Sequence, residues 1–541
     1  MTGKMKMNRI RTISGGWLLL PVILLAACGD APRRETIERA VVNGRLAGEA
    51  FARSHRFVEG WLAVADTVTG LIPKNLQGDY FWNAQDAAAD NYPFMVITSF
   101  FTDEGLFRGR MLDMLRTETE LTSCLGACPA TYDLRTHRLQ NNPVDTGNVI
   151  FGSAEYMKDG LLPITELLGV SPWSERMISI LDSLHGLVEI VTEIRGDYFG
   201  NSQVIEVNGD LLQVLSRLYW MTGREEYLEW AIRIGDYYLL GDRHPADSER
   251  LRLRDHGCEI MLGLCELYAT VHYARPQKQE QYRGPLHRLL DRVLEVGRNG
   301  HGLFYDEVNP STGEILETRL ADTWGYTLDG YYIVYQLDGV EAYRDAVLKV
   351  FSNLNAHYRS HNWENNMDGY ADAIESALNL YNRERSQEAA DWIDSEINVM
   401  YSFQRPDGIL EGWHGDGNFA RTAVMYALWK TRGTRLAPWR EDVQWGAADE
   451  EGKTVLVLTA GMPWRGKLFF DAPRYRENLH LPADWPRINQ FPQWFTVERD
   501  REYALCVDGV RKHCRGEELI DGIDIVLESG QRAVVTVSAC D

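Results

Sequence analysis

Acidic side chains stand four residues apart at the start of two apolar helical patterns. Asp255 and Glu259 form one such pair, and Asp368 and Asp372 form the other. Residues four apart share one face of a helix, so the carboxyl groups of each pair would point the same way. Apolar neighbours, such as those expected around Glu259, raise the pKa of a carboxyl group. Two carboxyl groups with different pKa values can act as a general acid and a general base.

The stretch EGWHGDGNF, residues 411–419, concentrates polar groups directly before another apolar helical run. Its glycines permit backbone conformations that other residues avoid, so the side chains between them can be aimed unusually. A helix cap needs one side chain, which Asp416 or Asn418 can supply. One cap does not explain the remaining polar and aromatic groups, so this loop is also a candidate site that includes Trp413 and His414.

Two more stretches combine acids with aromatic rings before helical patterns, YFWNAQDAAADNYPF at 80–94 and RLADTWGYTLDGYY at 319–332. Ordinary roles compete everywhere, because acids also cap helices and aromatic rings also fill cores. The candidate catalytic acids are Asp255, Glu259, Asp322, Asp372 and Asp416. The candidate binding residues are Trp82, Asp86, Asp90, Arg254, His256, Trp324, Tyr326, Trp413, His414 and Asn418. The spacing does not select which two acids would work together.

Helical hairpins are the elements that must position these groups. The segment 208–239 predicts two helices with a break at Thr222-Gly223, since its apolar residues recur at helical spacing. Similar pairs are expected at 329–354 and 369–403. The repetition of helix, short turn and helix is typical of an α-helical array, and further pairs are expected before residue 200.

After Trp439 the pattern changes to short β-branched or aromatic runs, such as KTVLVLTAG, IDIVLES and QRAVVTVSAC. The dipeptides Asp508-Gly509 and Ser529-Gly530 separate these runs as turns. The pattern predicts a compact antiparallel β domain over residues 439–541, arranged as a sandwich.

The N-terminal segment predicts export. Four basic residues precede an apolar run at 17–27, and Leu25-Ala26-Ala27-Cys28 follows with small residues before the cysteine. This string resembles the lipobox of bacterial lipoproteins. The resemblance implies that residues 1–27 are a signal peptide, that cleavage occurs before Cys28, and that Cys28 is lipidated. We therefore expect a bacterial cell-envelope protein, anchored to a membrane by lipid on the periplasmic or cell-surface side.

The net charge and the cysteines limit which classes of partner and which covalent or metal links can be expected. Cleavage would remove four positive charges and no negative one, changing the net charge from −22 to −26. Such a protein is repelled by nucleic acid phosphates and by anionic membrane surfaces, so we expect no nucleic-acid partner. Cys124 and Cys128 could form a disulfide in an oxidising compartment. The cysteine spacings do not fit a metal centre, and no metal or cofactor is predicted.

These features together resemble the (α/α)-toroid carbohydrate-active enzymes. The resemblance rests on the export signal, on hairpins with TG-x3-YL-x2-A junctions, and on the closing β region. It includes glycoside hydrolases of the unsaturated-uronyl and arabinofuranosidase kinds and related polysaccharide lyases. It implies a mainly α fold, an (α/α)6-type toroid over residues 28–438, followed by the β-sandwich. In that fold the inner helices form a ring, and the substrate lies at one end among the loops.

The resemblance implies a carbohydrate partner, and three functions follow from it. A glycoside hydrolase, acting on an exported glycan for which uronic acids are one candidate component, would use two carboxyl groups that flank the scissile bond. A polysaccharide lyase would use His256, His414 or Tyr326 as a base, with Arg254 or Arg421 neutralising a uronate carboxylate. A non-catalytic glycan-binding lipoprotein would use aromatic rings as platforms, and its acids would only donate or accept hydrogen bonds. The oligomeric state is not predicted.

Overall fold

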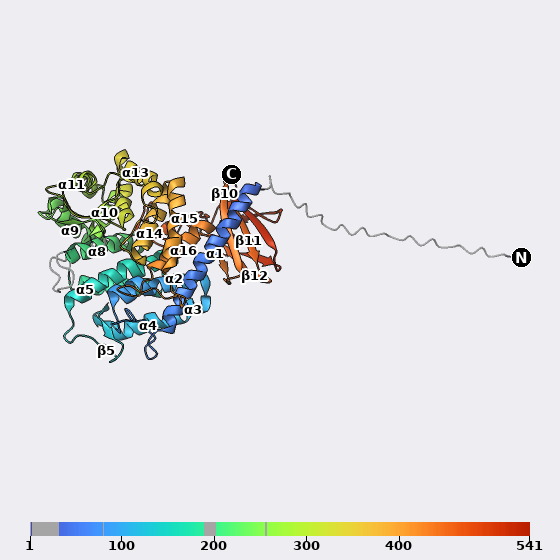
Figure 1. Cartoon of the computed structure of the whole chain (residues 1–541), viewed down its shortest axis with the longest axis horizontal. Coiled ribbons are helices and arrows are strands. Elements are labelled where there is room, and N and C mark those ends of the chain that lie inside the picture. Colours follow the sequence, from blue (N-terminus) through green and yellow to red (C-terminus); the bar gives the residue numbers. More distant parts are fainter. Residues whose placement is uncertain (1, 3–31, 79, 189–201, 255–256, 541) are drawn as a thin grey trace.

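The computed structural model describes residues 2, 32–78, 80–188, 202–254 and 257–540. The predicted signal peptide and Cys28 lie outside this part of the chain, and so do Asp255 and His256. Figure 1 shows helices on one side and antiparallel strands on the other, with the long helix α1 between them. Within the described ranges, no helix is both long and apolar enough to cross a membrane.

Two kinds of helix alternate along the helical region. Helices of the first kind bury one stripe and expose a polar face, as the spacing of the buried residues in α13 illustrates. These helices form an outer layer. They are α1 (Arg34–Ala63), α4 (Arg110–Thr122), α7 (Pro172–His185), α9 (Glu225–Gly235), α11 (Pro276–Val296), α13 (Glu341–His357) and α15 (Gln387–Ser402).

Helical segments of the second kind are buried nearly all round, and they form an inner layer. Every residue of α16, for example, is buried. The inner segments are η1 (Ala84–Asn91) continued by α2 (Tyr92–Thr102), α5 (Thr146–Glu155) continued by η2 (Tyr156–Leu161) and α6 (Leu162–Leu168), α8 (Ser202–Thr222), α10 (Cys258–Ala274), α12 (Trp324–Asp338), α14 (Met367–Arg383) and α16 (Asn418–Thr431).

The inner segments close into a ring. The π-helix η1 packs against η2, α5 against α8, and α8 against α10. Helix α10 then packs against α12, α12 against α14, and α14 against α16, which returns to α2. The prediction of a mainly α toroid of helical hairpins followed by a β region is confirmed.

Short elements fill the loops between these helices. The helical ones are α3 (Glu104–Arg108), η3 (Asp236–Leu240) and η4 (Pro245–Asp247). Three small antiparallel sheets consist of β1 (Phe81–Trp82), β4 (Tyr132–Asp133) and β5 (Arg138–Leu139); β2 (Ser123–Leu125) and β3 (Cys128–Pro129); and β6 (Leu251–Arg252), β7 (Tyr305–Asn309) and β8 (Glu314–Leu320). The predicted bridge between Cys124 and Cys128 is not formed: both thiols are free, and Cys124 Sγ instead lies 3.5 Å from the carbonyl oxygen of Cys128.

The C-terminal strands form two antiparallel sheets, ordered β10–β11–β16–β13–β14 and β15–β12–β9. The predicted turn at Asp508-Gly509 joins β13 to β14, and both of its residues have positive φ. Stacking of the two sheets into a sandwich stays a prediction. The strands are β9 (Arg435–Ala437), β10 (Val443–Glu450), β11 (Lys453–Ala460), β12 (Trp464–Phe469), β13 (Glu502–Val507), β14 (Val510–Arg515), β15 (Ile523–Leu527) and β16 (Arg532–Ala539), and α18 (Gly516–Ile520) precedes β15.

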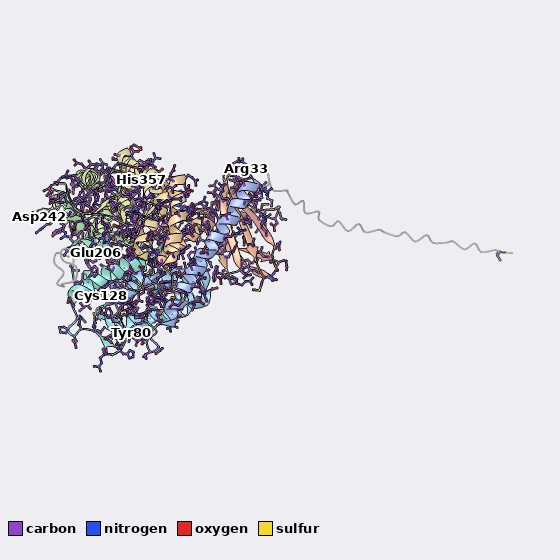
Figure 2. All side chains as sticks on the ribbon, in the orientation of Figure 1. Arg33, Tyr80, Cys128, Glu206, Asp242 and His357 are labelled. Atoms are coloured by element: carbon purple, nitrogen blue, oxygen red, sulfur yellow. The ribbon has the colours of Figure 1, made fainter. Side chains whose placement is uncertain are left out.

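Helix α1 joins the two regions. It packs against α16 of the ring and against β10 and β11 of the larger sheet. Gly44 and Gly446 allow this approach, because a Cβ on Gly446 would lie 2.1 Å from the backbone nitrogen of Gly44. Figure 2 places Arg33, at the start of α1, on the side that carries the strands.

A second connection is the chain between β12 and β13, residues 470–501, which we name the bridging segment. It contains the short helix α17 (Arg474–Glu477) and leaves the sheets to contact the helical ring. Asn478 Nδ2 donates to the carbonyl oxygen of Glu166 at 2.8 Å, and Arg487 Nη2 lies 2.6 Å from the carboxylate of the same residue. The bridging segment therefore brings residues remote in sequence to the inner helices.

Candidate active site

Acidic side chains from several inner segments gather near the N-terminal ends of the ring helices. The positive end of each helix dipole lies there, which favours carboxylates in the first turns. Burial and mutual repulsion act in the opposite direction and raise carboxyl pKa values. The acids of this centre are Asp86, Asp90, Asp159, Asp368, Asp372, Glu375 and Asp416.

Asp416 lies directly before α16, and its carboxylate accepts a hydrogen bond from the backbone N–H of Asn418 at 3.1 Å. Burial and the charge of Asp372 raise the pKa of Asp416 to about 6, although His414 lowers it. A carboxyl group with this pKa keeps its proton under mildly acidic conditions. Asp416 can therefore donate a proton to a leaving group.

Asp372, in the second turn of α14, is held by two partners. Arg421 Nη2 lies 2.6 Å from Asp372 Oδ1, and Tyr326 Oη lies 3.1 Å from the same oxygen. Tyr326 also donates to Glu375 Oε2 at 2.6 Å, and Arg421 lies 3.0 Å from that oxygen. The arrangement fixes Asp372 and places a positive charge beside it.

Asp368 was not among the predicted catalytic acids, and the structure adds it to the centre. Asp368 is not the cap of α14, because the side chain of Asn366 accepts from the backbone N–H of Gly369 in that role. Asp368 Oδ1 instead accepts from Asn418 Nδ2 at 2.9 Å. Burial, followed by the charge of Asp416, holds the pKa of Asp368 well above its ordinary value.

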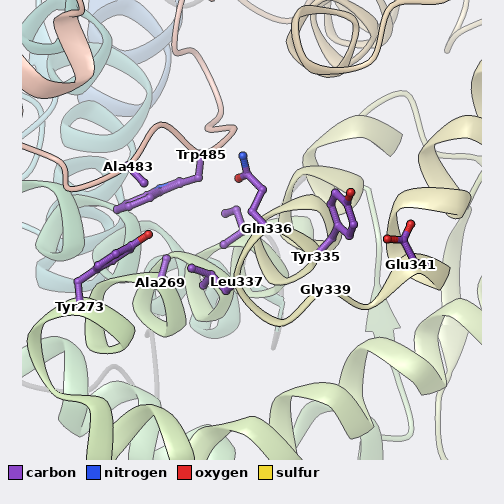
Figure 3. A pocket seen from close by; sticks show the side chains of 10 residues that line it. Ala269, Tyr273, Tyr335, Gln336, Leu337, Gly339, Glu341, Ala483 and Trp485 are labelled. Carbon is purple, nitrogen blue, oxygen red and sulfur yellow. The ribbon is translucent and has the colours of Figure 1, made fainter.

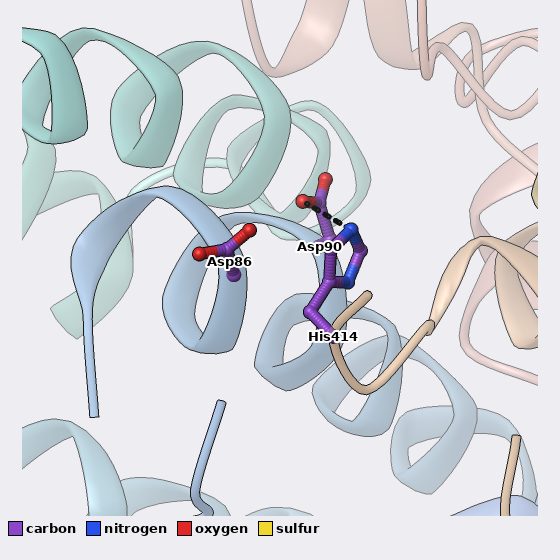
Figure 4. Close-up of side chains that lie close together, drawn as sticks. All are labelled: Asp86, Asp90 and His414. Atoms are coloured by element: carbon purple, nitrogen blue, oxygen red, sulfur yellow. Dashed lines mark ion pairs between the residues drawn. The ribbon is translucent and has the colours of Figure 1, made fainter. Parts of the chain in front are cut away.

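Asp90 and His414 form the other side of the centre (Figure 4). His414 Nε2 lies 3.7 Å from Asp90 Oδ2. Burial lowers the pKa of His414, but the charges of Asp90, Asp86 and Asp416 outweigh it and raise the pKa to about 9. Burial is also the main reason why the pKa of Asp90 stands well above its ordinary range. At neutral pH the imidazole is therefore a cation that stabilises the neighbouring carboxylates.

Asp86, Asp90 and His414 have ligand atoms within 4.8 Å of one another, a spacing that suits a metal ion. A metal ion there would have to displace the proton that His414, with its pKa of about 9, carries at neutral pH. Lys74 Nζ lies 3.2 Å from Asp86 Oδ2 and supplies a positive charge there. The donor set therefore fits an internal ion-pair network better than a metal centre.

Glu259 belongs to a neighbouring buried network around Lys158. Lys158 Nζ lies 2.9 Å from both Glu259 and Asp159, and 4.0 Å from Asp210. Gln213 Nε2 also donates to Glu259 at 3.1 Å. Burial raises the pKa of Glu259 as predicted, but its surroundings are polar where apolar ones were expected.

Trp413 stands at the rim and exposes 64% of its surface. Lys74 Nζ lies 4.2 Å from its ring centroid, a cation–π contact. Trp82 and Trp324 differ from the prediction, because only 2% and 0% of their surfaces are exposed. Their rings belong to the hydrophobic core, which offers no free face for stacking.

The remaining predicted residues lie beside the centre or outside the described chain. Asp322 Oδ1 lies 3.4 Å from Arg254 Nε, and Arg254 also pairs with Glu364. Asp322 raises the pKa of Asp368 slightly through its charge, which places it at the periphery. Asp255 and His256 lie outside the described residues, so their predicted roles stay predictions.

The sequence interpretation missed Lys74, Asp159 and Asn489. Lys74 and Asp159 had no motif around them that could have singled them out. Asn489 belongs to the bridging segment, whose sequence predicted only part of a β domain. It donates to Asp159 and accepts from Arg421, so it lies among the acids.

A separate cavity of about 540 Å³ lies between the C-terminal ends of α10 and α12 and the bridging segment (Figure 3). Its lining includes the rings of Tyr273, Tyr335 and Trp485. It contains a single carboxyl group, that of Glu341. Acid–base chemistry by paired carboxyl groups therefore points to the acidic centre and not to this cavity.

Comparisons with known proteins give weak structural likeness only. No protein-family model matches the chain, and no curated protein sequence matches it significantly. A GH76A α-1,6-mannanase from Salegentibacter sp. HEL1_6 has a TM-score of 0.39 and 12% identity, covering 70% of this chain and 98% of that one. A family 76 mannosidase from Bacteroides thetaiotaomicron has a TM-score of 0.40 and 13% identity, again covering 70% of this chain and 98% of that one. A cellobiose 2-epimerase from Bacillus thermoamylovorans has a TM-score of 0.37 and 13% identity, covering 51% of this chain and 87% of that one. Values this low transfer neither a substrate nor a reaction to this chain.

Proposed function

We propose that the protein is a glycoside hydrolase that acts on an exported glycan, with Asp416 as the general acid. The observation that carries the proposal is a buried carboxyl group whose pKa is raised to about 6, beside a second carboxyl group that a cation holds in place. Two carboxyl groups with separated proton affinities are what glycosidic cleavage needs.

Asp372 is the proposed partner of Asp416. Its charge raises the pKa of Asp416, which supports this pairing. The contacts from Arg421 and Tyr326 both use Oδ1 of Asp372, so Oδ2 can act as the base or as the nucleophile. The stereochemical outcome follows from which of these roles Asp372 takes.

The proposed substrate is an uncharged sugar chain. Lys74, Lys158 and Arg421 all contact carboxylates of the centre, and Arg254 pairs with Asp322 and Glu364. A uronate carboxylate would find these cations already paired with carboxylates, so we propose a neutral glycan in preference to a uronic-acid-containing one. Trp413 would stack on a sugar ring at the rim.

The lyase alternative has less support, because each predicted base of the described chain holds its proton at neutral pH. The pKa of His414 is raised to about 9, and burial raises the pKa of Tyr326 well above its ordinary value. Neither group can abstract a proton efficiently near neutral pH. Arg421 is committed to Asp372 and Glu375.

A panel of neutral and acidic polysaccharides and oligosaccharides tests the proposal. Each would be followed for new reducing ends and for ultraviolet absorbance at the same time. The proposal predicts new reducing ends without absorbance, on neutral glycans. Absorbance would identify a lyase, because elimination creates a conjugated double bond. Binding without turnover would identify the glycan-binding lipoprotein.

We further propose that the mature protein is a lipid-anchored envelope protein. The support is the predicted signal peptide ending before Cys28. A lipid anchor of this kind would hold the toroid near glycans outside the cytoplasm.

A further inference from the structure

One side chain of the bridging segment links three inner helical segments at the acidic centre. Asn489 Nδ2 donates to Asp159 Oδ1 at 3.0 Å, and its Oδ1 accepts from Arg421 Nη1 at 3.1 Å. Its backbone N–H donates to Glu375 Oε1 at 2.7 Å. These partners belong to η2, α16 and α14. One buried residue therefore satisfies groups from three parts of the ring.

The backbone of Asn489 has a φ of +59°, in the left-handed region. Asparagine enters this region more easily than most residues, and such conformations persist where the surroundings enforce them. The enforcement comes from the nearby Arg487, whose guanidinium lies 2.6 Å from Glu166 and 3.0 Å from Asp484. The bridging segment is thus anchored two residues away, and Asn489 is presented to the centre from a fixed position.

We infer that Asn489 is a positioning residue for the reaction, so that the C-terminal region completes the active site of the toroid. This inference rests on the proposed hydrolase function. Asn489 acts through Arg421: it holds one guanidinium nitrogen while the other holds Asp372. Its amide also neutralises repulsion around Asp159 by donating a hydrogen bond. Asn489 does not itself contact the substrate.

Asn489→Gly is the most direct variant. Glycine adopts a φ of +59° without strain, and it keeps the backbone N–H that donates to Glu375. The variant removes the side chain and with it both carboxamide contacts. We expect kcat to fall by about tenfold or more with little change in KM, because Asp372 loses its fixed position.

Asn478→Ala is the matched control on the same segment. Asn478 Nδ2 donates to the backbone carbonyl oxygens of Glu166 and Leu167, so it docks the segment without contacting a carboxylate of the centre. We expect a lower Tm and an unchanged kcat. An unchanged kcat in Asn489→Gly, or an equal loss in both variants when both are folded, would overturn the inference.

Asn489→Asp gives a readout that does not need turnover. The new carboxyl group would face Asp159 across the present 3.0 Å hydrogen bond, and the pair would share one proton. Arg421 contacts Oδ1 of Asn489 at 3.1 Å and would favour the ionised form, but Asp372 and Glu375 share its charge. Lys158 acts on the Asp159 side of the pair. The two facing carboxyl groups should therefore still have a pKa in the folded state above the unfolded value, so the variant should lose Tm relative to the wild type as pH rises from about 4 to 8. Equal pH dependence of Tm in both proteins would contradict the contact. If the wild type hydrolyses no glycan, the proposed function fails, and this comparison still decides the role of Asn489 toward Asp159.

Discussion

At the scale of single residues, His414 and Asp416 show how one loop prepares a proton donor. Burial and the charge of Asp372 raise the pKa of Asp416 to about 6. The charges of Asp90, Asp86 and Asp416 raise the pKa of His414 to about 9. The imidazolium limits how far the pKa of Asp416 rises. The loop thus holds a proton on the acid under mildly acidic conditions and a positive charge beside it.

His414→Gln should shift the pH dependence of catalysis. Loss of the imidazolium removes the charge that lowers the pKa of Asp416, so the alkaline limb of kcat/KM should move upward by about one unit. The measurement is a pH–rate profile, with His513→Gln on exposed β14 as control. An unmoved limb would show that His414 does not tune the acid.

The same substitution has a consequence for stability. The pKa of His414 is raised in the folded state, so its stabilisation is present in full below about pH 6.5 and is lost as pH rises through 9. The Tm difference between the wild type and His414→Gln should therefore be largest near pH 6 and shrink by pH 10. A constant difference across this range would argue against the protonated imidazole.

Trp413→Ala should weaken substrate binding more than turnover. The exposed indole is the proposed sugar platform, so its loss should raise KM about tenfold while kcat changes little. Steady-state kinetics on an oligosaccharide check this, with Met462→Ala as an equally exposed apolar control. A KM of Trp413→Ala equal to that of the wild type would indicate that the sugar binds elsewhere.

At the scale of elements, regular helices could be predicted from the sequence, whereas helices with irregular turns could not. The hairpin at 208–239 formed as predicted, with α8 ending at Thr222 and Gly223 taking a φ of +69°. Before residue 200, the π-helical segments η1 and η2 interrupt the 3.6-residue period, which hides the hairpins from a periodicity search. The acids of residues 411–419 could be found from their own loop. Asn489 could not, because only long-range packing of the bridging segment brings it to the ring.

Arg487→Ala tests how strongly the bridging segment is docked. Arg487 and Glu166 are both buried and paired at 2.6 Å, so removing the arginine leaves an uncompensated carboxylate. We expect a loss of about 3–5 kcal/mol in the free energy of unfolding, measured by urea titration. Arg515→Ala, which breaks an exposed pair with Asp500, should cost less than about 1 kcal/mol. Similar losses in the two variants would contradict the buried pairing.

At the scale of the whole molecule, an acidic protein surrounds an acidic centre. The net charge of −22 and the paired cations of the ring both disfavour anionic substrates. The predicted lipid would place this charge near a membrane while holding the toroid outside the cytoplasm. The β region contributes to the toroid through α1 and the bridging segment, so the two regions are expected to act together.

Cys28→Ser should release the protein from the membrane. Without the thiol no lipid can be attached, so the variant should appear in the soluble fraction and lose incorporation of labelled fatty acid. Cys540→Ser, in the C-terminal region, is the control and should stay in the membrane fraction. Membrane association of Cys28→Ser, or an unlabelled wild type, would contradict the lipoprotein prediction.

The most direct measurement of the central claim is the pH–rate profile of Asp416→Asn on a neutral oligosaccharide that the wild type hydrolyses. If Asp416 is the general acid, kcat of the wild type has an alkaline limb near pH 6, and the variant loses about 10²–10⁴-fold in kcat and loses that limb. Asp407→Asn, on the exposed turn before the same loop, should keep both the rate and the limb. Wild-type turnover by Asp416→Asn would contradict the assignment of Asp416 as the general acid.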